Sequence, residues 1–253
     1  MALSLAAESL GIDSEHFLFK QLPPEVEGLI ERSVYNRRVR RLRFKLEDLR
    51  KRRVDKINPD KALYVVDSMP LEICKLSRAN RSKICQEAED SAPNYGCCAA
   101  QNFHYFDYKL HAVCTPEGII KMYDLSKASK HDIHYLNDIQ CRLDNCVLVG
   151  DKGYLSQQWQ DDLFKQSEVN LQTPKRRNQK DYKKFPRYYS KSRKRIETLF
   201  SQLCDQFMIR RNYAKSFSGI ARRIVTKITS LTLIQWVNKR EGNKLNNIKI
   251  VIS

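Results

Sequence analysis

The chain has 253 residues, which is enough for one large domain with a small appendage and a sizeable buried core. Its 46 Lys and Arg residues outnumber its 29 Asp and Glu residues, and the net charge of +17 favours polyanionic partners, above all nucleic acid; a ribosome-associated or membrane-surface protein is the alternative. No stretch approaches the roughly 18 consecutive apolar residues of a membrane-spanning helix, so we expect no membrane partner.

Residues 1–57 are predicted to be helical and basic. No capping residue precedes Leu3, so we expect the chain to begin inside a helix, and the same stretch lacks the basic start of a secretory signal. Ten of the seventeen residues between Arg37 and Arg53 are Lys or Arg around one apolar stripe, which favours contact with phosphates over a merely solvated helix face. The cations that we expect to contact DNA here are Arg37, Arg38, Arg40, Arg41 and Arg43.

Three strands and a loop that carries cysteines follow. The runs 62–66, 105–113 and 119–123 are apolar or alternating and predict strands, and a turn at Thr115-Pro116-Glu117-Gly118 joins the last two. None of the eight cysteines stands in a C-x-x-C pair, so we expect reduced thiols. A zinc site is the alternative, although its spacing is unfamiliar; its ligands would be Cys85, Cys97, Cys98 and His104.

The second half of the chain alternates helices and strands. The pattern predicts helices over 130–142, 155–166, 188–211 and 217–239, and strands over 146–149 and 169–172. A basic segment, 175–187, precedes the first long helix. This order predicts a mixed α/β fold, for which an RNase H-like mixed sheet flanked by helices is one candidate among several.

Two aspartates follow runs that we expect to be buried strands. Asp67 follows Val65-Val66, and Asp151 follows Val149-Gly150. This would place both carboxylates at the carboxyl ends of strands, where open sheets usually bind ligands. Taken singly, each aspartate has a simpler explanation as a turn or helix-capping residue.

A third acid, Glu197, borders the apolar stripe of the predicted helix 188–211. The stripe consists of Ile196, Leu199, Phe200, Leu203 and Phe207. Because Glu197 lies beside this stripe, with Arg193 one turn before it, its carboxylate can face the strand ends. The alternative is an exposed Glu–Arg pair on a solvated helix.

Three carboxylates that gather repel one another unless cations join them. Mg²⁺ and Mn²⁺ prefer hard oxygen ligands, and two such ions about 3.5–4 Å apart can activate a water or 3′-hydroxyl and stabilise the leaving oxygen of a phosphodiester. We therefore expect Asp67, Asp151 and Glu197 to bind two metal ions and to be catalytic. The cations expected to contact the DNA backbone nearby are Lys152, Lys175, Arg176, Arg177, Lys183, Lys184 and Arg193.

Four short blocks stand in a recognisable order. They are Val65-Val66-Asp67-Ser68-Met69-Pro70, Tyr108-Lys109-Leu110-His111, Gly150-Asp151-Lys152-Gly153-Tyr154 and Arg195-Ile196-Glu197-Thr198-Leu199-Phe200-Ser201-Gln202-Leu203. Together they resemble bacterial insertion-sequence transposases of the DDE type, most closely the insertion-sequence family numbered nine hundred and eighty-two. The likeness covers residues 5–239.

The resemblance implies an RNase H-like fold, dependence on Mg²⁺ or Mn²⁺, and binding of double-stranded DNA at insertion-sequence ends and at a target. It implies cleavage that frees a 3′-hydroxyl for strand transfer, with metal-binding roles for Asp67, Asp151 and Glu197, and it makes Arg193 a phosphate or carboxylate partner of the site. By analogy it implies a homodimer in the bacterial cytoplasm, associated with the nucleoid. His131-Asp132 matches a recurring pair, for which helix capping competes with a role in the site.

We therefore expect three parts: a helical DNA-binding region over 1–57, truncated at its start, an RNase H-like catalytic domain over 58–211, and a C-terminal helix and tail over 212–253 that pack on the catalytic domain. Two other functions compete with that of a transposase. Another RNase H-like nuclease, such as a resolvase or repair enzyme, would share the acids without strand transfer. A catalytically decayed copy would only bind DNA.

Overall fold

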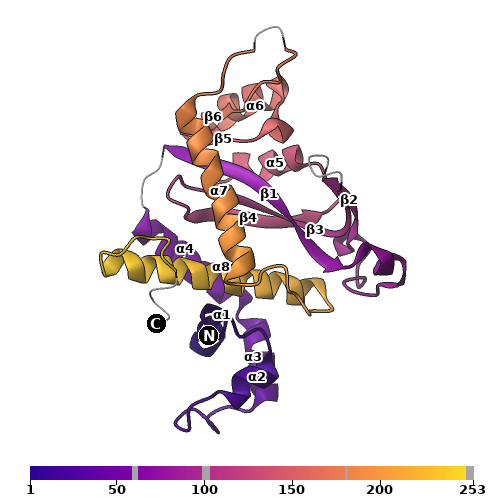
Figure 1. Ribbon diagram of the computed structural model, residues 1–253, viewed down its shortest axis with the longest axis vertical. Helices are drawn as coiled ribbons and strands as arrows, with labels where there is room; N and C mark the ends of the chain where they lie inside the picture. The colour runs from indigo at the N-terminus through magenta and orange to yellow at the C-terminus, as the bar shows by residue number, and fades with distance from the viewer. Residues whose placement is uncertain (59–61, 99–102, 180–181, 249–253) are drawn as a thin grey trace. The chain divides into compact units, whose positions relative to one another are not determined.

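The computed structural model of the chain describes residues 1–58, 62–98, 103–179 and 182–248 (Figure 1). By its internal contacts the chain divides into two compact units, Met1–Pro59 with Ser201–Ser253, and Asp60–Phe200. The residues after Phe200 thus group with the N-terminal helices, whereas the sequence suggested a boundary at 211/212. No helix in the described ranges has both the length and the apolar character needed to span a membrane.

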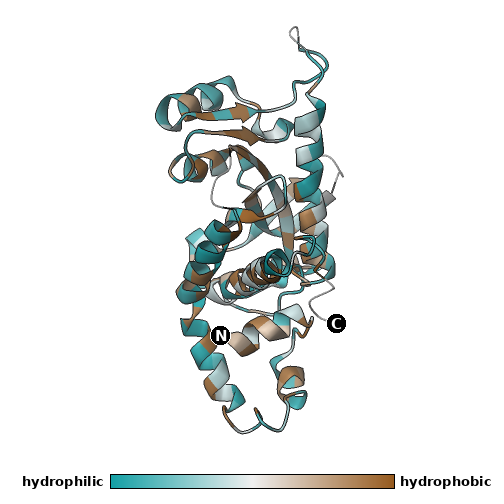
Figure 2. Ribbon diagram, turned by 90° about the vertical axis from the view of Figure 1, so that its left-hand side faces the viewer, coloured by the Kyte–Doolittle hydropathy of each residue, from teal (hydrophilic) through white to brown (hydrophobic). Residues whose placement is uncertain are grey.

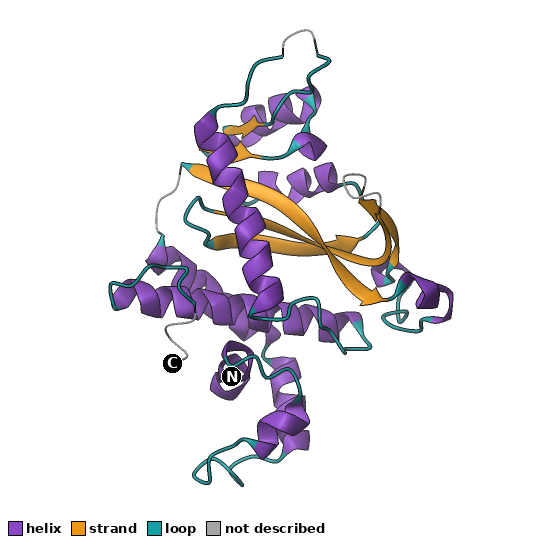
Figure 3. Ribbon diagram, in the orientation of Figure 1, coloured by secondary structure: helices purple, strands orange, loops and turns teal. Residues whose placement is uncertain are grey.

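The unit Asp60–Phe200 is built around a six-stranded mixed sheet (Figure 3). The strands are β1 (Leu63–Cys74), β2 (Asn94–Cys98), β3 (Phe103–Cys114), β4 (Ile120–Lys127), β5 (Cys146–Val149) and β6 (Val169–Gln172). Their order is β2-β3-β1-β5-β6, and β4 also pairs with β3. Because β1 is antiparallel to β3 and parallel to β5, the sheet is mixed. The predicted RNase H-like α/β fold, a mixed sheet flanked by helices, is confirmed.

Helices and short 3-10 turns connect the strands of this unit. They are η1 (Leu76–Arg81), η2 (Glu89–Ser91), η3 (Asp132–Tyr135), α5 (Leu136–Gln140), η4 (Lys152–Tyr154), α6 (Gln157–Ser167) and α7 (Arg187–Asp205), which continues past Phe200. The predicted helix 130–142 is therefore a 3-10 turn followed by a short α-helix. It ends where the backbone N–H groups of both Arg142 and Leu143 donate to the carbonyl of Ile139.

One face of the sheet packs against α5 and α6. Val66, Val113 and Leu148 from three strands and Leu136 and Leu163 from the two helices belong to one buried cluster. In Figure 2 the strands are largely hydrophobic, while α5 and α6 mix hydrophilic and hydrophobic residues. Residues that alternate with this cluster along β1, such as Val65 and Asp67, point to the other face of the sheet.

Strand β1 is longer than its apolar run predicts. The prediction that Asp67 ends its strand is wrong, because the antiparallel ladder with β3 continues from Val65 opposite Cys114 to Cys74 opposite Phe106. Pro70 lies within this ladder, in the part of β1 that β5 leaves unpaired, and a proline is tolerated at such an edge. Near the end of the ladder, the register shift is bridged by Asp107, whose Oδ1 accepts the N–H of Ile73 at 2.9 Å.

The predicted turn between β3 and β4 is confirmed, and it requires glycine. The N–H of Gly118 donates to the carbonyl of Thr115 at 2.8 Å, and Gly118 has a φ of +89°. A Cβ at this position would both strain the backbone and overlap the guanidinium of Arg195 from α7. The turn and α7 are therefore packed in direct contact.

The other unit, Met1–Pro59 with Ser201–Ser253, is helical. Its helices are α1 (Ala2–Ser9), α2 (Glu15–Lys20), α3 (Arg32–Arg41), α4 (Arg43–Ile57) and α8 (Phe217–Arg240). α8 packs against α1 and α4, and its residues from Ile220 to Asn238 are buried on more than one side. A helix that is apolar on most sides needs several packing partners, which explains why the C-terminal residues join the N-terminal helices.

A buried ion pair ties α1 to α8. The ammonium of Lys227 is fully buried and contacts the carboxylate of Glu8; it also donates to the carbonyl of Phe207 at 2.6 Å. Burial lowers the pKa of Lys227, and the carboxylate of Glu8 acts in the opposite direction. The pair is held together because neither charge has water to solvate it.

We expect Lys227→Met to lower the free energy of unfolding by about 3–5 kcal/mol, because Glu8 would be left charged and buried. Urea titration of the variant beside wild type measures this loss. Lys20→Met, which removes an exposed lysine, is the matched control. The double variant Glu8→Gln/Lys227→Met should recover most of the loss, and a single variant that loses less than about 1 kcal/mol would contradict the role of the pair.

Candidate active site

Asp67 and Asp151 occupy equivalent positions on two neighbouring strands. β1 and β5 run parallel, and their last paired residues are Val65 and Val149. Asp67 lies two residues beyond Val65, and Asp151 lies two residues beyond Val149. Because paired parallel strands are about 4.8 Å apart, this register brings the two carboxylates to the same point of the sheet edge. The sequence-based pairing of these two residues is thus reproduced, although β1 continues past Asp67.

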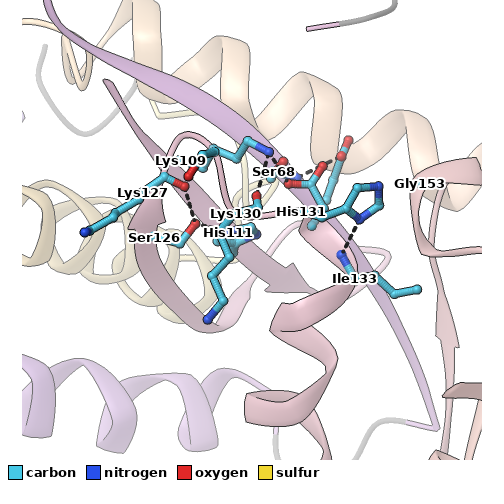
Figure 4. Close-up of polar contacts among 12 residues, drawn as sticks. Ser68, Lys109, His111, Ser126, Lys127, Lys130, His131, Ile133 and Gly153 are labelled. Atoms are coloured by element: carbon cyan, nitrogen blue, oxygen red, sulfur yellow. Dashed lines mark hydrogen bonds and ion pairs between the residues drawn. The ribbon is translucent and has the colours of Figure 1, made fainter. Parts of the chain in front are cut away.

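Backbone N–H groups fix one oxygen of each carboxylate. Oδ1 of Asp67 accepts the N–H of Ser68 at 2.8 Å, and Oδ1 of Asp151 accepts the N–H of Gly153 at 2.7 Å (Figure 4). The second bond makes Asp151 the N-cap of η4. Asp151 can therefore cap η4 and also belong to the site, since only one of its two carboxylate oxygens is used by the cap.

Burial and neighbouring charges raise the pKa of Asp67 to about 7. Loss of solvent is the largest cause; the N–H of Ser68 opposes it, the charge of Asp151 adds to it, and the guanidinium of Arg193 opposes it again. Asp132 contributes a smaller effect in the raising direction. Burial, with the charge of Asp151, thus disfavours the ionised form of Asp67, and positive charge from a bound divalent cation would oppose both effects.

Arg193 and Glu197 lie one turn apart on α7. Arg193 is half-buried and its charge lowers the pKa of Asp67, while its role as a phosphate or carboxylate partner of the site stays a prediction. The side chain of Glu197 is exposed. The structure therefore brings Arg193 within electrostatic reach of Asp67, and the assignment of Glu197 stays a prediction.

Two carboxylates are a suitable, if incomplete, donor set for Mg²⁺ or Mn²⁺. Mg²⁺ is commonly held by one or two carboxylates, with water and substrate phosphate completing its shell. Within the described ranges, no group of three or more His, Cys, Asp and Glu residues is arranged to hold a metal ion. Asp67 and Asp151 fit the expected cation by the hardness of their oxygens and by their shared excess of charge.

A polar network that the sequence did not reveal lies beside the two aspartates. Nζ of Lys109 on β3 contacts Oδ1 of Asp132 on η3 at 3.0 Å and donates to the carbonyl of Lys130 at 3.0 Å (Figure 4). His111, two residues along β3, is buried and stacks on Tyr135 with ring centroids 4.8 Å apart. The sequence could have indicated part of this network, because Lys109 and His111 are two residues apart on a predicted strand and so lie on the same face.

Of the recurring pair, His131 has the capping role that the sequence favoured. Its Nδ1 accepts the N–H of Ile133 at 3.3 Å and so caps η3 (Figure 4). Desolvation by burial lowers the pKa of the neighbouring His111 to about 4, with Asp132 opposing and the lysines Lys109 and Lys130 assisting. His111 is therefore neutral near pH 7, and its Nε2 shares a 2.7 Å hydrogen bond with Ser126.

Most of the cations assigned to DNA are exposed. Those in the catalytic unit are Lys152, Lys175, Arg176, Arg177, Lys183 and Lys184. Those in the helical unit are Arg37, Arg38, Arg40 and Arg41, while Arg43 is half-buried, with its guanidinium 5.3 Å from the ring of Phe44. Two others in the same run have structural roles: Arg50 is buried and paired with Glu47, and Arg53 stacks on Trp236 at 4.3 Å. The cations of this run that stay exposed and outside such pairs are thus mostly in its first half, and their contact with phosphates stays a prediction.

The cysteines of the described residues are free thiols, as expected of a reduced protein. They are Cys74, Cys85, Cys97, Cys114, Cys141, Cys146 and Cys204. The zinc alternative receives no support within the described ranges, where no metal-binding group forms; the side chain of Cys98 lies outside them. Burial raises the pKa of Cys85 to about 11, so this thiol is protonated at neutral pH.

The chain was compared with known proteins at the level of families, sequences and structures. The family described as the transposase DDE domain matches residues 58–233, which include both aspartates, Arg193 and Glu197. No curated protein and no solved structure matches the chain.

The raised pKa of Asp67 predicts a dependence of stability on pH in metal-free buffer. The unfolded chain releases this proton near pH 3.8, whereas the folded protein keeps it to about pH 7. Stability from the protonated group is therefore present below pH 4 and is lost as the pH rises to 7. Asp67→Asn should be more stable than wild type by up to about 4 kcal/mol at pH 8 and little different at pH 4, measured by urea unfolding with chelator.

Mg²⁺ gives the same experiment a second readout. At pH 8, added Mg²⁺ should raise the Tm of wild type and leave Asp67→Asn unchanged, because the variant has lost one charged ligand. Asp161→Asn, which removes an exposed acid from α6, should behave as wild type. Equal stabilisation of wild type and Asp67→Asn by Mg²⁺ would remove Asp67 from the cation site.

Proposed function

Because the chain belongs to the transposase DDE domain family, we propose that it cuts DNA at the ends of an insertion sequence and joins the freed ends to a target. The observation that carries this proposal is the equivalence of Asp67 and Asp151, each two residues beyond the last paired residues of parallel strands. Two acids at the carboxyl edge of a mixed sheet, with an arginine from a following helix, are suited to phosphodiester chemistry.

Asp67 and Asp151 would hold the cation, and Glu197 would complete the set of acidic ligands from α7. A bound Mg²⁺ or Mn²⁺ supplies Lewis-acid stabilisation of the phosphate and of the leaving oxygen. Asp67 gives up its proton as positive charge enters the site, because its raised pKa results from burial and from Asp151. Arg193 would bind a phosphate oxygen, since the charge of its guanidinium already lowers the pKa of Asp67.

The proposed cleavage is an in-line displacement at phosphorus. A water oxygen forms the new bond to phosphorus, the bond from phosphorus to the 3′-oxygen breaks, and the water proton ends on that oxygen as a 3′-hydroxyl. In strand transfer the same 3′-hydroxyl takes the place of water and attacks a target phosphodiester, releasing the target's own 3′-oxygen. One acidic site serves both steps, because only the nucleophile differs.

The exposed cations would hold the DNA backbone. Lys152 directly follows Asp151, and the segment with Lys175, Arg176 and Arg177 follows β6 in the same unit. Phosphate contacts of this kind orient the duplex and supply affinity without reading sequence. The four sequence blocks support the finer assignment to the insertion-sequence family numbered nine hundred and eighty-two, and by analogy a homodimer acting on DNA in the bacterial cytoplasm.

We expect Mg²⁺- or Mn²⁺-dependent nicking of linear DNA that carries the element's flanking ends. Asp151→Ala and Glu197→Ala should each reduce the rate at least about 100-fold, because each removes a ligand of the reacting centre, while DNA affinity changes little. Nicking is followed on denaturing gels, with binding measured in parallel. A Glu197→Ala variant that still nicks would remove Glu197 from the site.

Strand transfer with pre-cleaved ends separates the transposase from another RNase H-like nuclease. The proposed function requires joined products from wild type and none from Asp151→Ala. Cleavage without joining would indicate a resolvase or repair nuclease. Intact DNA binding without either reaction would indicate a catalytically decayed copy.

DNA affinity should fall steeply as salt rises, because the exposed cations displace counterions from phosphates. Lys183→Ala and Lys184→Ala should each weaken binding similarly for all sequences and reduce the slope of log K against log salt by about 1. Fluorescence anisotropy at several salt concentrations measures both effects. Lys165→Ala, an exposed lysine on α6 outside the basic segments, is the control, and a flat salt response of wild type would contradict the phosphate contacts.

A further inference from the structure

Asp132 lies beside the two aspartates of the candidate site, although it belongs to a different part of the chain. It is the first residue of η3, and η3 contacts η4, the turn that Asp151 caps. We propose that Asp132, held in place by Lys109, is a third acidic residue of the cation site, a positioning residue that acts through its charge and not as a direct ligand. This inference rests on the proposed function.

The ion pair with Lys109 shows that the position of Asp132 is built into the fold. Both side chains are largely withdrawn from solvent, with 12% of Lys109 and 28% of Asp132 exposed, so the 3.0 Å contact is unlike a loose surface pair. Nζ of Lys109 also donates to the carbonyl of Lys130, which fixes the chain on the other side of His131. Through these two bonds Lys109 holds the start of η3 and the residue Lys130 before it against β3.

An unpartnered hydroxyl lies within electrostatic reach of all three acids. The hydroxyl of Tyr154 is fully buried and has no hydrogen-bond partner within the described ranges. Asp132, Asp67 and Asp151 all act on it, in that order of strength, and with burial they raise its pKa. A buried hydroxyl without a partner is costly, so this point calls for a polar occupant such as water between the hydroxyl and the carboxylates.

The three carboxylates differ in the groups that stabilise their negative charge. Asp67 and Asp151 receive backbone N–H groups on one oxygen each, whereas Asp132 receives the ammonium of Lys109. Asp132 offsets the positive charge of Lys109, so without its carboxylate a cation bound by the two backbone-held aspartates would face an uncompensated ammonium. Residues just outside a ligand set typically change metal affinity 10–100-fold when altered.

The test is Mn²⁺ affinity of the full chain without DNA, measured by electron paramagnetic resonance of free Mn²⁺. Asp132→Asn keeps an oxygen that can accept from Lys109 and removes only the charge; we expect it to raise the Kd for Mn²⁺ about tenfold. Asp132→Glu, which retains the charge, should recover at least part of the affinity. Asp138→Asn, an acid of α5 whose field acts on Asp124, is the matched control and should stay within twofold of wild type.

A Kd within twofold of wild type for Asp132→Asn would overturn the inference, whatever happens to its Tm. If that variant does not fold, Mn²⁺ broadening of amide signals in wild type decides: the amide of Ile133 must broaden more than that of the control residue Asp138, and equal or weaker broadening overturns the inference. Asp67→Asn separates the two proposals. Unchanged Mn²⁺ binding in Asp67→Asn refutes the two-aspartate site itself, whereas loss there with no effect of Asp132→Asn refutes only the role of Asp132.

Discussion

The unequal lengths of two neighbouring strands determine where the candidate site lies. β1 has twelve residues and β5 has four, and they pair only over Leu63–Val65 and Val147–Val149. Beyond that point β1 is held on one side by its antiparallel ladder with β3, so an edge opens beside Asp67. The chain leaving β5 turns at this edge into η4, which brings Asp151 to the same place. A longer β5 would cover Asp67 with a strand and remove the site.

The charge of the chain acts on two different length scales. The net charge of +17 attracts a polyanion from outside, but exposed charges are screened over about 8–10 Å at physiological salt and do little for an acid within the fold. The pKa of Asp67 accordingly reflects burial, Asp151 and the nearby Arg193. An excess of positive charge on the surface can therefore coexist with an excess of negative charge at the sheet edge. The proposed DNA phosphates and the proposed divalent cation would thus be attracted to different parts of the same protein.

The sequence was informative where local pattern decides structure and uninformative where distant pairing does. Apolar runs located five of the strands, and the glycine turn at Gly118 joined the correct pair. The extension of β1 through Pro70 was missed because it depends on a ladder with residues more than thirty positions away. The clamp of Asp132 by Lys109 is of the same kind, since it joins residues of β3 and η3 that no periodicity relates. The burial of Arg50 within a run of exposed cations could not be predicted from the sequence either.

Repulsion among carboxylates explains why the acids of this site are separated by the protein's own cations. Asp67 already retains a proton to about pH 7 with Asp151 beside it, so a third carboxylate in direct contact would raise the cost of ionisation further. The fold instead pairs Asp132 with Lys109, sets Arg193 near Asp67, and leaves Glu197 exposed. Asp67 and Asp151 are thus fixed at the sheet edge, whereas Glu197 is exposed on α7. A further carboxylate could approach Asp67 and Asp151 only with added positive charge, so any acid that joined them would depend on a bound cation.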